Sequence, residues 1–131
     1  MRKRYWMELT SAEFARLDKA RTIAVQPVAA IEQHGPHLAV ATDTAIAEGM
    51  IAEVMNRLPD DLSVLFLPIQ AIGKSNEHLM SPGTLTLTAE TAIAAWTEIG
   101  HSVHRAGLAK DRKSTRLNSS HATLSRMPSS A

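Results

Sequence analysis

The chain has 131 residues, enough for one domain, and 44% of them are hydrophobic, an ordinary fraction for a globular protein. It has no cysteine, which excludes disulfides and thiolate metal sites. The net charge is +1, and residues 1–110 carry ten basic and twelve acidic side chains, so nucleic-acid binding is not indicated. No apolar run approaches the length of a membrane span and no signal peptide is evident. We therefore expect a cytoplasmic protein without membrane partners.

The N-terminal segment is basic and aromatic, which could suggest a nucleic-acid or membrane patch, but it has too few charges for that role. We interpret it as a segment that packs Tyr5 and Trp6 on a neighbouring element. Thr10, followed by Glu13 three residues later, predicts a capping box at the start of a helix over residues 11–20.

Two apolar runs, residues 22–30 and 63–69, predict strands buried on both faces of a parallel sheet. Apolar residues at helical spacing predict helices over residues 44–58 and 88–106. The alternation of strands and helices indicates an α/β fold with a mainly parallel sheet. The apolar faces of the two helices are expected to comprise Ile46, Met50, Ile51, Val54, Met55 and Leu58 in the first, and Ile93, Trp96, Ile99 and Val103 in the second.

The loop after the first strand holds the strongest candidate site. Glu32 and His34 are two residues apart at the expected end of the strand, so their side chains leave the backbone on the same face. Gly35 and Pro36 then turn the chain and bring Asp43 back. Two carboxylates and an imidazole suit catalytic zinc or manganese. Spacing alone leaves simpler roles equally open, such as a helix N-cap for Asp43 and a surface carboxylate for Glu32.

The same residues resemble the signature of the creatininase family. Residues 32–38 read Glu-Gln-His-Gly-Pro-His-Leu and are followed by Asp43, as in that signature. Residues 73–78, Gly-Lys-Ser-Asn-Glu-His, and 81–85, Ser-Pro-Gly-Thr-Leu, are similar to the family's serine-containing loop and Pro-Gly-Thr turn. Residues 22–110 follow the order of the family throughout.

The resemblance implies the N-terminal fragment of a metal-dependent amidohydrolase with a creatininase-like α/β sandwich. It implies two divalent metal ions, zinc or manganese, with Glu32 on one ion, His34 on the other and Asp43 bridging them. The implied reaction is hydrolysis of the C–N bond of a small amide, which is cyclic in creatinine. A family member acting on a formamide or a modified peptide would have the same motifs, so the sequence leaves the substrate open. A homo-oligomer is implied for the complete protein.

The second motif raises several further expectations. By resemblance Ser75 contacts substrate, while its alternative role is a turn hydroxyl bonded to its own backbone. Adjacent residues rarely face one centre, so we expect Glu77 and His78 to hold the loop rather than act as an acid and base pair. We interpret His101 and His104, three residues apart on a helix, as a solvated or interface pair.

The composition changes abruptly at residue 111. Residues 111–121 and 125–131 match, residue for residue, the in-frame translation of a common short-read sequencing adapter. We therefore expect residues 111–131 to be a non-native, disordered tail, the domain to comprise residues 1–110, and the sheet to be truncated after the second strand and the third helix. The family's next motif, Asn-Gly-His, is absent, so the remaining ligands and catalytic residues are expected in a missing C-terminal part. Two alternatives stay open: a natural Ser-rich tail, and an inactive fragment with no function of its own.

Overall fold

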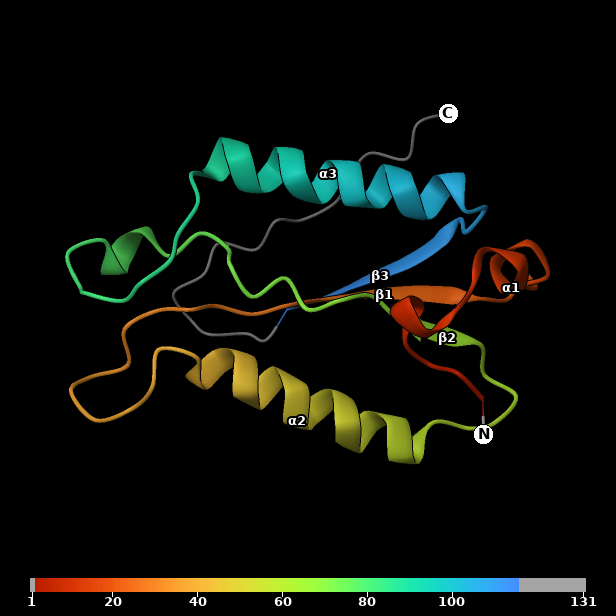
Figure 1. The fold of residues 1–131 in the computed structure, drawn as a ribbon, viewed down its shortest axis with the longest axis horizontal. Coiled ribbons are helices and arrows are strands. Elements are labelled where there is room, and N and C mark those ends of the chain that lie inside the picture. Colours follow the sequence, from red (N-terminus) through yellow and green to blue (C-terminus); the bar gives the residue numbers. More distant parts are fainter. Residues whose placement is uncertain (1, 116–131) are drawn as a thin grey trace.

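A computed structural model describes residues 2–115 as three layers, with a sheet lying between two long helices (Figure 1). The strands are β1 (Ile23–Val28), β2 (Val64–Phe66) and β3 (Lys110–Thr115), and the long helices are α2 (Thr42–Arg57) and α3 (Ala89–Arg105). All strand pairs are parallel. The predicted α/β sandwich is confirmed. Within the described residues, no helix is long and apolar enough to cross a membrane.

The strand order is β2-β1-β3, so the chain moves from β1 to one side of the sheet and then crosses to the other side. Helix α2 connects β1 to β2, and α3 connects β2 to β3. Because such crossovers are right-handed and run in opposite directions here, the two helices cover opposite faces (Figure 1). In sheets of this kind, ligands bind beyond the carboxyl ends of the strands, near the point where the winding direction reverses. That point is next to β1.

Both faces of β1 are covered, as predicted. Ala24 packs with Leu67, Val103 and Leu108 on the α3 side. Ile23 and Val25 pack against a cluster on the α2 side that comprises Ile51, Val64 and Phe66. Successive side chains of a strand point to opposite faces of the sheet, so Ala24 packs on one side and Ile23 and Val25 pack on the other.

The apolar faces predicted for α2 and α3 include residues that are exposed in the structure. Met50 is 54% exposed, and Val54 and Ile93 are also exposed. Three strands spaced about 4.8 Å apart offer a narrow surface, so each helix buries only the row of side chains directly above the sheet.

The third strand corrects our expectation that the sheet is truncated after the second strand. Residues 110–115 pair with β1 in parallel, from Ile23 opposite Lys110 to Val28 opposite Thr115. We predicted no strand there because the segment is hydrophilic. Ladder hydrogen bonds join backbone groups and need no particular side chain, so the edge of β1 can pair with such a segment. The rest of the expected tail, residues 116–131, lies outside the described residues.

The N-terminal segment packs as expected. Tyr5 forms a parallel bridge with Phe66, and the rings of Trp6 and Phe14 have centroids 4.6 Å apart. The capping box of Thr10 and Glu13 is present, but helix α1 covers only Ser11–Ala15 rather than residues 11–20.

A turn at Asp18 follows the end of α1. The backbone oxygen of Asp18 accepts hydrogen bonds from the backbone N–H groups of Arg21 and Thr22, and its side chain accepts one from Arg21. Such local side-chain bonding offers the backbone a turn in place of a helix.

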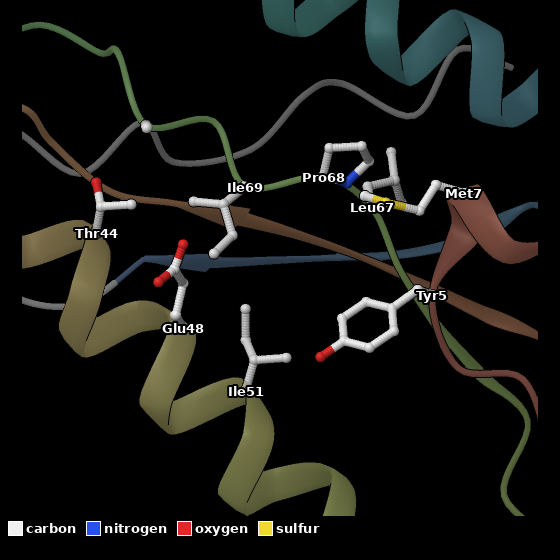
Figure 2. A pocket seen from close by; sticks show the side chains of 9 residues that line it. Tyr5, Met7, Thr44, Glu48, Ile51, Leu67, Pro68 and Ile69 are labelled. Atoms are coloured by element: carbon white, nitrogen blue, oxygen red, sulfur yellow. The ribbon is translucent and has the colours of Figure 1, made fainter.

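A cavity of about 430 Å³ lies between α2 and the segment that follows β2 (Figure 2). Its walls are mostly apolar, and its polar groups come from Tyr5, Thr44 and Glu48. None of the residues predicted to bind metal or substrate lines it.

Candidate metal centre

The candidate centre lies at the carboxyl end of β1, in the loop that leads to α2. Three hydrogen bonds of 2.9 Å fasten this loop: Glu32 N–H to the Val40 oxygen, Leu85 N–H to the Ile31 oxygen, and the Thr44 hydroxyl to the Ala30 oxygen. The first bond lies within the loop, the second connects the loop to the second motif, and the third connects it to the first turn of α2.

A tight turn reverses the chain within this loop. Gly35 has a φ of +74°, a conformation that side chains with a Cβ rarely adopt, and Pro36 follows it. His34 and Leu38 form an antiparallel bridge across the turn. The turn therefore holds the backbone of His34 close to the returning chain, which continues into α2.

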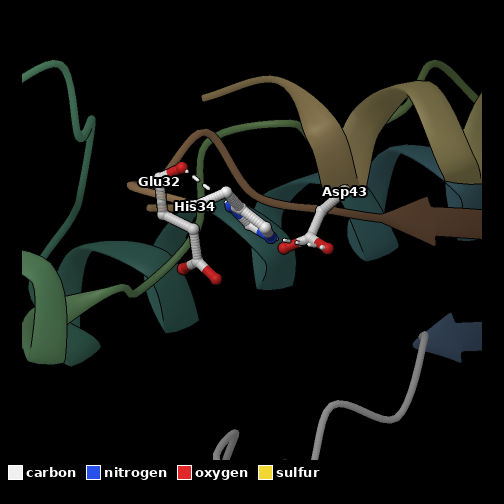
Figure 3. A group of neighbouring side chains, drawn as sticks. All are labelled: Glu32, His34 and Asp43. Atoms are coloured by element: carbon white, nitrogen blue, oxygen red, sulfur yellow. Dashed lines mark hydrogen bonds and ion pairs between the residues drawn. The ribbon is translucent and has the colours of Figure 1, made fainter. Parts of the chain in front are cut away.

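Glu32, His34 and Asp43 converge, as the sequence predicted (Figure 3). One donor atom from each residue lies within 4.8 Å of the other two. The His34 ring is held on both sides, with Nδ1 3.0 Å from the backbone oxygen of Glu32 and Nε2 3.5 Å from Oδ1 of Asp43.

These two contacts determine which nitrogen of the His34 ring carries a proton and which one can bind a metal. A backbone oxygen only accepts hydrogen bonds, so the contact at Nδ1 requires a proton on that nitrogen. In the neutral ring, Nε2 then presents a lone pair toward the carboxylate of Asp43. Two electron pairs facing each other are stabilised by a cation between them, either a metal ion or a proton on Nε2. Metal-ligating histidines are commonly oriented in this way by a backbone carbonyl, so the geometry is compatible with that role.

The simpler roles weighed for the two carboxylates do not match their positions. Glu32 is 2% exposed, so it is not a surface carboxylate. The N-cap of α2 is Ala41, and Asp43 lies in the first helical turn, where the helix dipole favours a negative charge. A buried carboxylate is costly unless cations or hydrogen-bond donors surround it.

The donor set fits a divalent metal. Zinc and manganese accept imidazole nitrogen and carboxylate oxygen, at distances of about 2.0–2.2 Å for zinc, which separates ligands of one ion by at most about 4.4 Å. A spread within 4.8 Å needs only small side-chain movements to meet that limit. Paired ions in hydrolases lie about 3.5–4 Å apart, so the same donors can also be shared between two ions.

The second motif reaches the same centre. His78, at the end of the short helix η2 (Asn76–His78), has its Nε2 4.0 Å from Oε1 of Glu32. Glu32, Glu77 and His78 form a second group of donor atoms within 4.8 Å of one another. We expected the pair not to face one centre. Both side chains have several rotatable bonds and can converge even from adjacent positions. In the sequence, the signal that could have indicated this convergence is the position of Glu77 and His78 within the second motif.

Ser75 lies just before η2 and is 1% exposed. Its backbone N–H donates to the Thr86 hydroxyl at 2.8 Å. Its own hydroxyl is covered, so a substrate can meet it only by inserting a group into the loop. His101 and His104 are both exposed on α3, and among residues 2–109, whose side chains the structure describes, no metal-competent group includes them.

Comparison with protein families places residues 7–111 in the creatininase family, described as creatinine amidohydrolase. A mycofactocin precursor peptide peptidase from Mycobacterium tuberculosis is 37% identical over 101 residues, which cover 72% of this chain and 40% of the relative. A peptidase of the same name from Mycolicibacterium smegmatis is 36% identical over 81 residues, covering 60% of this chain and 33% of the relative. The chain thus spans well under half the length of these relatives.

Solved structures agree on the fold. A manganese creatininase matches with a TM-score of 0.71 and 25% identity, over 86% of this chain and 44% of that structure. A Zn-Zn type mutant creatininase matches equally well, with a TM-score of 0.71 and 25% identity over 86% of this chain and 45% of that one. A crystal structure of creatinine amidohydrolase has a TM-score of 0.65 and 27% identity, over 86% of this chain and 44% of that structure.

Proposed function

Since this chain belongs to the creatininase family, we propose that Glu32, His34 and Asp43 supply part of the metal centre of an amidohydrolase. The observation that carries the proposal is the convergence of one imidazole and two carboxylates at the carboxyl end of β1, within 4.8 Å. The metal is zinc or manganese, in keeping with the named metal forms of the similar creatininases.

In this proposal each residue has a distinct part. The Glu32 carbonyl orients the His34 ring, so that Nε2 is offered as a ligand. Asp43 faces the same nitrogen. By family resemblance, Glu32 would hold one of two ions, His34 would hold the other, and Asp43 would be shared by both. When bound, such ions polarise the substrate carbonyl and activate the water that attacks it.

The substrate class is an amide with a hydrolysable C–N bond. We favour a peptide over creatinine, because the peptidases are 36–37% identical and the three solved creatininases 25–27%. Creatinine and a formamide remain the alternative substrates. Ser75 is the proposed substrate contact, with a small substrate group inserted into its loop. We further propose that the complete protein is cytoplasmic and forms a homo-oligomer.

A second proposal concerns the 131 residues by themselves. The chain spans about 40% of the length of the Mycobacterium tuberculosis relative. Because only three of the family's ligands are assigned here, we propose that this chain binds metal weakly and does not hydrolyse amides alone. We also retain the proposal that residues 111–131 are a translated sequencing adapter, which resequencing the source gene across residue 110 would test.

Metal titration and amide hydrolysis test both proposals. The 131-residue chain and a complete protein containing residues 1–110 are compared, with zinc and manganese as probes and with creatinine and the mycofactocin precursor peptide as substrates. We expect hydrolysis by the complete protein alone, and metal binding that is lost in Asp43→Ala. A complete protein that binds no metal would rule out the proposed centre. Efficient hydrolysis by the 131-residue chain would rule out the second proposal.

A further inference from the structure

His78 approaches the centre from a segment distant in sequence. Its Nε2 lies 4.0 Å from Oε1 of Glu32. The Glu32 side chain is 2% exposed, whereas the His78 side chain is 30% exposed. The imidazole therefore borders the buried carboxylate and partly separates it from solvent.

The backbone around His78 is held at both ends of η2. The His78 N–H donates to the Ser75 oxygen at 3.1 Å, and the His78 oxygen accepts from the Ser81 N–H at 3.0 Å. The segment is fastened to the next one by the bond from Leu87 N–H to the Gly73 oxygen, at 2.8 Å. The backbone that carries the ring is thus held by several backbone hydrogen bonds.

The loop fixes the backbone of Glu32, and His78 borders its side chain. The Glu32 N–H donates to the Val40 oxygen, but three rotatable bonds separate that backbone from the carboxylate. A separation of 4.0 Å is too long for a hydrogen bond and short enough for the ring to restrict where the carboxylate can lie. Groups outside the ligands of a metal site help to orient those ligands.

We infer that His78 is a positioning residue for Glu32, holding the buried carboxylate where it can ligate metal. This inference rests on the proposed metal centre. A direct ligand is the competing role, since Glu32, Glu77 and His78 also form a group within 4.8 Å. The two roles differ in chemistry: glutamine is similar to histidine in length and polarity and can restrict the carboxylate by contact, whereas it is a poor substitute for an imidazole ligand.

Metal titration of the full chain separates the roles. We expect His78→Ala to weaken zinc binding at least tenfold, the lower end of the loss found for outer-shell partners, and His78→Gln to retain affinity within about threefold. His104→Ala, a change at an exposed histidine on α3, is the control and should alter nothing. Equal losses in His78→Ala and His78→Gln would overturn the inference in favour of a ligand, and unchanged affinity in both would overturn it outright. Thermal melting of each variant reports loss of folding.

A second measurement does not depend on metal. The imidazole nitrogen resonances of His78 should shift on Glu32→Gln and stay in place on Glu90→Gln, which alters an exposed carboxylate on α3. If the His78 resonances do not shift on Glu32→Gln, then His78 does not contact Glu32 and the inference is wrong. A chain that shows this shift but binds no metal would contradict the proposed centre, because the two results are independent.

Discussion

His34 Nε2 and Asp43 Oδ1 lie 3.5 Å apart, although one residue precedes the Gly35 turn and the other belongs to the first turn of α2. The pair closes the loop between β1 and α2. Its geometry depends on the same turn that the sequence marks with Gly-Pro, so the site and the local fold are specified together.

The first prediction is that Asp43→Ala in the complete protein lowers amide hydrolysis by roughly 100-fold or more, because the loss of a ligand costs more than the loss of an outer-shell partner. His104→Ala should stay within a few-fold of the unchanged protein. Metal content by elemental analysis, together with initial rates, checks both. Normal activity in Asp43→Ala would remove this residue from the centre.

The second prediction separates Ser75 from His78. Ser75→Ala should lower kcat/KM by about tenfold, the cost of roughly one hydrogen bond to substrate, and should leave metal content unchanged. His78→Ala should lower metal content. Ser102→Ala, an exposed hydroxyl on α3, is the matched control. If Ser75→Ala lowers only the melting temperature, its buried hydroxyl is structural.

Local sequence patterns were enough to predict the first half of the site. Glu32 and His34 are brought together by the period of a strand, and Asp43 by a turn of few residues. The capping residue Thr10 was equally predictable, because its N-cap hydroxyl accepts a hydrogen bond from the backbone N–H of Glu13, three residues away.

Contacts between distant segments were harder to predict. The approach of His78 to Glu32 depends on how η2 packs beside the β1 loop, and no local pattern carries that information. β3 was missed because its pairing with β1 uses backbone groups, while our prediction relied on apolar side chains. The number of buried residues on each helix was overestimated, because the sequence of a helix does not reveal how wide the sheet beneath it is.

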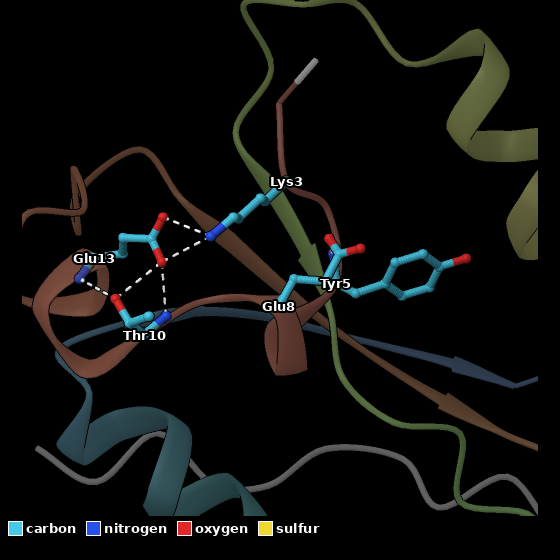
Figure 4. A network of polar contacts seen from close by, with 5 residues as sticks. All are labelled: Lys3, Tyr5, Glu8, Thr10 and Glu13. Atoms are coloured by element: carbon cyan, nitrogen blue, oxygen red, sulfur yellow. Dashed lines mark hydrogen bonds and ion pairs between the residues drawn. The ribbon is translucent and has the colours of Figure 1, made fainter.

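The third prediction concerns acid sensitivity at the N-terminal capping box (Figure 4). The Lys3 ammonium, 2.7 Å from Glu13, and hydrogen bonds from Thr10 lower the pKa of Glu13 from its ordinary 4.5 to about 2. A lowered pKa in the folded state means that ionised Glu13 stabilises the fold above pH 4.5, and that this contribution is lost as the pH falls toward 2. The carboxyl carbon resonance of Glu13 should therefore titrate near pH 2.

Lys3→Met tests the cause of that shift, because the Lys3 side chain makes the largest contribution. The pKa of Glu13 should rise toward 4.5 in this variant. Because a folded pKa close to the unfolded value contributes no pH dependence, the fall in melting temperature between pH 7 and pH 3 should be smaller than in the unchanged protein. A wild-type midpoint already near 4.5 would show that the network in Figure 4 does not persist in solution.

The last prediction concerns β3. Its six residues pair with β1 along the whole strand, so a chain ending at Ala109 would leave the β1 edge unpaired and open to association with another chain. Ladder hydrogen bonds contribute about 1 kcal/mol each, and 1 kcal/mol corresponds to roughly 4 °C in a domain of this size. We expect residues 1–109 to melt roughly 10 °C or more below residues 1–131 and to aggregate at lower concentration. Asp111→Asn with Lys113→Gln keeps the backbone and changes only side chains, so it should melt within about 2 °C of the original chain. Equal melting of the truncated and full chains would mean that β3 contributes nothing to the sheet.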